Sequence, residues 1–122
     1  MNKILLADDQ PGSRELIGAV LANAGYEVVE AVNGVEALER AREIDPILIL
    51  LDLQMPQLDG FGVIRALRAE ARFAATPVVA ITASAMHGDR EKALDMGFTS
   101  YLTKPIRLPE LRKEIARLLV IR

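Results

Sequence analysis

The chain has 122 residues, of which 51% are hydrophobic, and a formal net charge of −2. This length predicts one domain over residues 1–122, with no effector domain. The lack of cysteine excludes disulfides and thiolate metal sites, and the nearly balanced charge argues against nucleic-acid binding. The longest apolar stretch, residues 47–51, is far below the roughly 20 residues of a membrane span, and we see no secretory leader, so we expect a cytoplasmic protein that does not bind membranes.

Four short apolar runs lead into polar residues that could do chemistry. They are residues 4–7 before Asp8 and Asp9, residues 47–51 before Asp52, residues 78–81 before Thr82, and residues 101–102 shortly before Lys104. Continuous apolar runs fit strands that are buried on both faces. Because helical patterns separate the runs, the alternation predicts an α/β fold with a parallel sheet. The polar residues then meet at the carboxyl edge, where open α/β sheets bind ligands.

A first helix is predicted after the turn at residues 10–13, with Pro11 in its first turn. Gly25 is placed to end this helix. The next strand candidate, residues 27–30, is the most polar one, which suits the edge of the sheet. The predicted inner stripe of the helix consists of Leu16, Ile17, Val20 and Leu21.

A second helix is predicted from Asn33 as its N-cap, with Glu36 in the position of a capping box. It should end at Asp45, because the residue before a proline avoids the helical region. After Asp52 comes a turn-rich loop, residues 53–60. The third helix that follows has an inner face made of Phe61, Ile64 and Leu67.

Two further helices are predicted in the last third of the chain. One covers about residues 89–96 and is ended by Gly97. The other begins at about Leu108, with Pro109 in its first turn. Its apolar face consists of Leu111, Ile115, Leu118 and Leu119.

The carboxylates of Asp8, Asp9 and Asp52 should lie close together at the sheet edge. A pair of like charges about 4 Å apart costs roughly 4 kcal/mol at an effective dielectric of 20, so a cation is expected among them. Mg²⁺ takes oxygen ligands, typically one or two carboxylates plus a phosphate oxygen, which Asp9, Asp52 and a phosphoryl donor would supply. The single histidine, His87, and the lack of cysteine argue against zinc.

Asp52 is the best candidate nucleophile, because it ends the most apolar strand and a carboxylate oxygen can attack phosphorus to give an acyl phosphate. Lys104 would neutralise charge on the phosphoryl oxygens, and Thr82 would donate a hydroxyl hydrogen bond to them. The sequence therefore predicts a magnesium-dependent site at which an aspartate is phosphorylated.

The chain resembles the receiver domain of two-component response regulators over nearly its full length. The resemblance rests on Asp8-Asp9, on residues 51–56 with Asp59-Gly60, on residues 81–83, and on residues 101–105. It implies a single doubly wound, flavodoxin-like sheet of five parallel strands in the order 2-1-3-4-5, with helices on both faces. It also implies that Asp52 accepts a phosphoryl group from a phosphohistidine on a histidine kinase or a histidine phosphotransfer protein.

The resemblance assigns a role to each position that matches the family. Asp9, Asp52 and the backbone carbonyl of Gln54 would hold Mg²⁺, and Asp8 would act through a bound water. Thr82 and Lys104 would hold the phosphoryl oxygens, and the peptide bond before Pro105 would be cis. Tyr101 matches the aromatic that turns inward when Thr82 moves toward the phosphoryl group, so Thr82 and Tyr101 would form the switch. Gln54 and Ser84 match positions that tune the loss of the phosphoryl group.

Several alternatives remain open on the sequence alone. The chain could be a stand-alone regulator or the receiver piece of a hybrid histidine kinase or larger regulator. A second copy of the chain could bind through the last helix and the strand edge with Tyr101.

A small phosphatase with an aspartate nucleophile would need an Asp-x-Asp arrangement, which the adjacent Asp8 and Asp9 do not provide. A flavodoxin-like cofactor binder would want a phosphate loop rich in Gly, Ser and Thr, where this chain has two carboxylates. A receiver catalyses only its own phosphorylation and dephosphorylation, so we expect a switch rather than a metabolic enzyme.

Overall fold

Five parallel strands form the central sheet of the computed structural model, which describes residues 2–83 and 89–119. The strand order is β2-β1-β3-β4-β5, so the predicted 2-1-3-4-5 order is confirmed. The strands are β1 (Lys3–Ala7), β2 (Glu27–Ala31), β3 (Leu48–Asp52), β4 (Val78–Thr82) and β5 (Ser100–Thr103). Every residue of β3 and β4 is buried, whereas β2 lies at an edge and is half exposed, as its polar sequence predicted.

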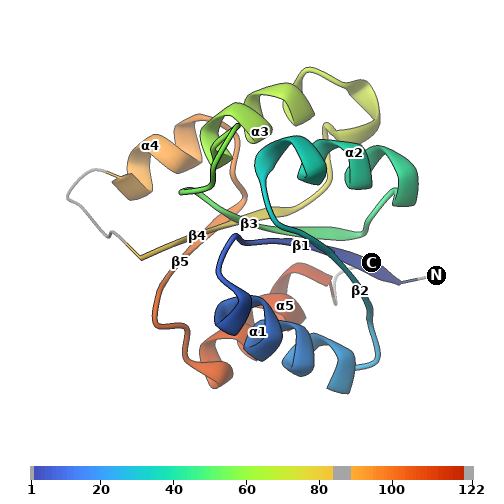
Figure 1. Cartoon of the computed structure of the whole chain (residues 1–122), viewed down its shortest axis with the longest axis vertical. Coiled ribbons are helices and arrows are strands. Elements are labelled where there is room, and N and C mark those ends of the chain that lie inside the picture. Colours follow the sequence, from blue (N-terminus) through green and yellow to red (C-terminus); the bar gives the residue numbers. More distant parts are fainter. Residues whose placement is uncertain (1, 84–88, 120–122) are drawn as a thin grey trace.

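Helices cover both faces of this sheet (Figure 1). α1 and α5 lie on one face, and α2, α3 and α4 lie on the other. A short 3₁₀ helix, η1 (Ala71–Phe73), was not predicted, and its Phe73 is fully buried. The α-helices are α1 (Pro11–Asn23), α2 (Gly34–Ile44), α3 (Gly60–Arg68), α4 (Asp89–Asp95) and α5 (Leu108–Leu119).

The two faces of the sheet form two separate hydrophobic clusters. Alternate residues of each strand enter opposite clusters, because successive side chains of a strand point to opposite faces. In β3, for example, Ile49 packs on the side of α2 and α3, and Leu50 packs on the side of α1 and α5. This explains why the central strands are apolar without a break.

The predicted inner stripe of α1 needs one correction. Ile17, Val20 and Leu21 are buried, but Leu16 is 51% exposed. Adjacent residues of a helix are about 100° apart around its axis, so the face that packs on the sheet reaches Ile17 and leaves Leu16 in solvent.

The helix boundaries follow from local chemistry. The Asn33 side chain accepts a hydrogen bond from the Glu36 backbone N–H at 2.8 Å and caps α2. The Glu36 carboxylate accepts from the Val32 N–H at 2.9 Å, one residue before the position of an ordinary capping box. Asp45 ends α2 in the left-handed region, with φ of 53°. None of the helices described here is long and apolar enough to cross a membrane.

Candidate functional site

Asp8 and Asp52 lie level with each other at the carboxyl edge of the sheet. Ala7 is paired with Leu51 in the β1–β3 register, and the next residues are Asp8, directly after β1, and Asp52, the last residue of β3. One carboxylate oxygen from each of Asp8, Asp9 and Asp52 lies within 4.8 Å of the others. The sheet therefore brings together the three carboxylates that the sequence predicted would meet.

The surroundings of the three carboxylates differ. Asp8 is fully buried and the Asp52 side chain is 4% exposed, whereas Asp9 is exposed. A cluster of hard oxygen donors with one member open to solvent fits Mg²⁺, which keeps several waters when it binds. Neither sulfur nor imidazole belongs to this cluster, so its donor chemistry favours magnesium over zinc.

Backbone hydrogen bonds orient both buried carboxylates. Asp8 Oδ1 accepts from the Gln10 N–H at 2.9 Å, and Asp52 Oδ1 accepts from the Gln54 N–H at 2.9 Å. Both bonds span two residues, the pattern of an Asx-turn. They fix one oxygen of each aspartate, and the other oxygen, Oδ2, lies against Lys104.

Lys104 bridges the two buried aspartates. Its Nζ lies 3.0 Å from Asp8 Oδ2 and 3.0 Å from Asp52 Oδ2, and its side chain is only 10% exposed. Burial by itself lowers the pKa of Lys104, but hydrogen bonds and charge attraction from the two carboxylates outweigh it and raise the pKa. Lys104 is therefore a fixed positive charge beside Asp52.

The backbone around Lys104 fixes where its side chain begins. The Lys104 N–H donates to the Thr82 carbonyl at 2.7 Å, which ties the end of β5 to the end of β4. The peptide bond between Lys104 and Pro105 is cis, as the resemblance implied.

The surroundings of Asp52 perturb its protonation. Its burial raises its pKa to about 6, and the neighbouring Asp8 charge adds to this rise. The Gln54 N–H and the Lys104 ammonium act in the opposite direction. Asp52 is thus still mostly ionised at neutral pH, in a setting that disfavours its charge.

A glycine lets the β3–α3 loop close over Asp52. A Cβ on Gly60 would lie 2.7 Å from the Asp52 carbonyl oxygen, closer than real Cβ atoms approach. The preceding residue, Asp59, caps α3 by accepting from the Gly62 N–H at 2.9 Å. The Asp59-Gly60 pair therefore starts the helix and allows the loop to pack against the site.

Thr82 and Tyr101 lie on neighbouring strands, Thr82 on β4 next to β3 and Tyr101 on the edge strand β5. Thr82 is 1% exposed at the end of β4, where it pairs in register with Thr103 of β5. Tyr101 is 9% exposed, and its ring packs in the cluster on the α2–α3–α4 side of the sheet. Two residues named in the sequence analysis, Ser84 and His87, lie outside the described residues.

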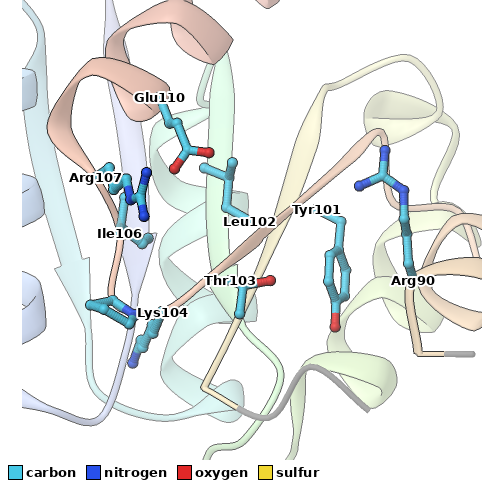
Figure 2. Close-up of a pocket in the computed structure, with 9 residues that line it drawn as sticks. Arg90, Tyr101, Leu102, Thr103, Lys104, Ile106, Arg107 and Glu110 are labelled. Atoms are coloured by element: carbon cyan, nitrogen blue, oxygen red, sulfur yellow. The ribbon is translucent and has the colours of Figure 1, made fainter. Parts of the chain in front are cut away.

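An open cavity of about 620 Å³ runs along β5 next to the site. Figure 2 shows Tyr101 and Thr103 on this strand and Lys104 directly after it, with Arg90 of α4 beyond Tyr101. Arg107, directly before α5, and Glu110, in the first turn of α5, lie on the other side of this strand. Lys104 is thus shared between the aspartate site and this outer surface.

Sequence reasoning missed one residue of the site. The Gln10 side chain accepts a hydrogen bond from Lys104 Nζ at 3.1 Å, across 94 positions of sequence. Its only sequence signal is its place directly after Asp8 and Asp9. Glutamine there has no chemistry that would single it out before the fold is known.

Comparison with known proteins places this chain in a family. The family model for the response regulator receiver domain matches residues 4–116, so the chain belongs to this family of two-component signalling domains. Receiver domains generally act as signal switches rather than as enzymes, through contacts with histidine kinases and phosphotransfer proteins.

Three similar proteins illustrate where such domains occur. The chain is 36% identical to the polar-differentiation response regulator DivK of Brucella anthropi, over 92% of this chain and 91% of DivK. It is 39% identical to the DNA-binding dual master transcriptional regulator RpaA of Synechocystis sp., over 98% of this chain but 49% of RpaA, so it spans about half the length of that relative. The receiver domain of a sensor histidine kinase from Pseudomonas aeruginosa, solved with a magnesium ion in its active site cleft, is 36% identical, with a TM-score of 0.88 and 96% of each chain covered.

Proposed function

We propose that this chain is a phosphoacceptor switch, in which Asp52 takes a phosphoryl group from a phosphohistidine of a histidine kinase or a histidine phosphotransfer protein. The observation that supports this best is the position of Asp52. It is a buried carboxylate with a fixed ammonium 3.0 Å away and two further carboxylates beside it. Such a site combines a nucleophile, a counter-charge for phosphoryl oxygens and oxygen ligands for a metal.

In the proposed reaction, a carboxylate oxygen of Asp52 forms a bond to phosphorus while the bond from phosphorus to the imidazole nitrogen breaks. The products are an acyl phosphate on Asp52 and the imidazole of the donor. Asp9, Asp52 and the backbone carbonyl of Gln54 would hold Mg²⁺, with Asp8 acting through a bound water. When bound, Mg²⁺ supplies positive charge to the phosphoryl oxygens.

Asp52 and Lys104 supply the rest of the chemistry. Asp52 is mostly ionised at neutral pH, because its pKa is about 6, so it is ready to attack. Its burial keeps bulk water away from the reacting oxygen. The Lys104 ammonium can exchange its hydrogen bond to Asp52 for one to a phosphoryl oxygen, because both acceptors are anionic oxygens at the same end of the site.

The proposed switch lies in Thr82 and Tyr101. The Thr82 hydroxyl would move to donate to a phosphoryl oxygen, and the buried ring of Tyr101 would repack with it. The surface that would change lies along β5 and α5, where partners or a second copy of the chain would bind. This output is proposed both for a stand-alone regulator, like DivK, and for a receiver joined to further domains, like RpaA.

The proposal is tested by intact-mass measurement after incubation with acetyl phosphate and Mg²⁺. The wild-type chain should gain a single phosphoryl group, and addition of a chelator should prevent it. The Asp52→Asn variant should gain none. Asp59→Asn is the matched control, because asparagine also caps a helix and Asp59 lies in the same loop.

Two results would count against the proposal. Labelling of Asp52→Asn at the wild-type rate would remove Asp52 as the acceptor. Continuous release of phosphate from a small phosphate ester, with no labelled protein, would favour the phosphatase alternative instead.

A further inference from the structure

Gln10 connects the start of α1 to the end of β5. It is the N-cap residue of α1, in extended conformation, and its backbone N–H donates to Asp8 Oδ1. Its side chain does not cap the helix. Instead, its amide oxygen accepts from Lys104 Nζ at 3.1 Å.

This contact gives the Lys104 ammonium a second hydrogen bond, beside the one to Asp52 and the ion pair with Asp8. A lysine ammonium has three N–H donors and no acceptor. Among the described residues, three oxygens lie within hydrogen-bond distance of it: Asp8 Oδ2 at 3.0 Å, Asp52 Oδ2 at 3.0 Å and Gln10 Oε1 at 3.1 Å. Gln10 supplies the one acceptor that is uncharged.

The side chain of Lys104 needs such an anchor, because it lies at the boundary between the buried site and solvent. A second open cavity, of about 460 Å³, is lined by Gln10 and Lys104 together with Gly12 and Ser13 of α1. Lysine has a long flexible stem and strong hydration, so an ammonium beside open space loses order easily. A third partner on the cavity side restrains it.

We infer that Gln10 is a positioning residue for phosphoryl transfer. It keeps the Lys104 ammonium at the site while this ammonium changes its hydrogen-bond acceptor from Asp52 to an incoming phosphoryl oxygen. The inference rests on the proposed function. When Asp52 Oδ2 loses its contact with Lys104, Asp8 and Gln10 still hold the ammonium on two sides. Because the Gln10 amide carries no charge, it does not compete with the phosphoryl group as another anion would.

The test compares Gln10→Met with wild type in saturating Mg²⁺. Methionine has a similar length but no oxygen acceptor. Two quantities are measured: the rate of labelling by acetyl phosphate, and the exchange of the Lys104 ammonium protons with water by ¹⁵N NMR. Gly12→Ala is the control, because a Cβ at Gly12 meets nothing within 4 Å although the residue lines the same cavity.

We expect Gln10→Met to slow labelling about three- to ten-fold, the effect of losing one ordinary hydrogen bond, because this contact is exposed to solvent. The Lys104 ammonium protons should exchange several-fold faster, and Gly12→Ala should change neither quantity. Labelling at the wild-type rate would overturn the inference, as would slower labelling with unchanged ammonium exchange. If wild-type protein takes no label, the proposed function is wrong. If wild type is labelled and Gln10→Met is labelled equally fast, only this inference is wrong.

Discussion

Replacing Asp52 with Asn removes a buried negative charge that destabilises the fold. The Asp52 side chain is 4% exposed and shares the single ammonium of Lys104 with Asp8. Its burial, and then the Asp8 charge, raise its pKa to about 6, although Gln54 and Lys104 act to lower it. Asparagine has nearly the same shape and no charge, so Lys104 would keep its ion pair with Asp8 and its hydrogen bond to Gln10.

The pKa gives both the sign and the size of the effect. The pKa of Asp52 rises from 3.8, its ordinary value, to about 6 in the fold, so the folded protein binds this proton more tightly than the unfolded chain does. The stabilisation from Asp52 is therefore fully present below pH 3.8 and is lost as the pH rises through about 6. Each pKa unit corresponds to about 1.4 kcal/mol, so ionised Asp52 destabilises the fold by about 3 kcal/mol at neutral pH.

Urea unfolding followed by circular dichroism checks this prediction, in metal-free buffer across the acidic to neutral range. The stability advantage of Asp52→Asn over wild type should be small at acidic pH and should reach about 3 kcal/mol above pH 7. Mg²⁺ should reduce this difference in the free energy of unfolding, because a ligand at 100 times its dissociation constant stabilises the wild type by about 2.7 kcal/mol. The reasoning would be refuted if the difference in the free energy of unfolding did not change with pH. It would also be refuted if the wild type were more stable than Asp52→Asn at neutral pH without metal.

Two further substitutions test how the fold supports the site. Arg68→Met should lower the free energy of unfolding by about 2–4 kcal/mol in urea, because the guanidinium donates to the carbonyls of Phe73, Thr76 and Gly97. All three carbonyls would lose this donor, and the Phe73 carbonyl would keep the Thr76 N–H at 3.3 Å. Arg68→Lys should recover part of this loss, and full stability of Arg68→Met would contradict the assignment. Asn33→Ala should cost about 1 kcal/mol by loss of the α2 cap, seen as a lower midpoint in thermal unfolding. Asn33→Asp keeps the cap and should stay near wild type, and an equal loss in both variants would show that capping is not the cause.

The sheet and its functional edge could be predicted because their signals are local. Buried parallel strands are continuous apolar runs, and Asp52 ends one of them directly. The two glycines predicted to end α1 and α4, Gly25 and Gly97, both have positive φ in the structure. Parallel pairing then makes separate strand ends meet, so the cluster of Asp8, Asp9 and Asp52 follows from topology alone.

Other features depend on contacts that no local pattern encodes. Arg68 looks like an ordinary charged residue at the end of α3, yet it binds the Gly97 carbonyl 29 positions away. The role of Gln10 likewise depends on its hydrogen bond with Lys104, which is 94 positions away in the sequence. Whether Leu16 packs or stays exposed depends on how α1 is rotated against the sheet, which an apolar stripe fixes only to within one residue.

Locating the phosphoryl group on the chain tests the central claim most directly. The chain would be labelled with acetyl phosphate and Mg²⁺, reduced with borohydride to convert an aspartyl phosphate into homoserine, digested, and mapped by mass spectrometry. We predict homoserine at position 52 and nowhere else, at a yield that follows the intact-mass labelling. Homoserine at position 8 or 9, or a labelled chain with Asp52 intact, would contradict the assignment of Asp52 as the phosphoacceptor.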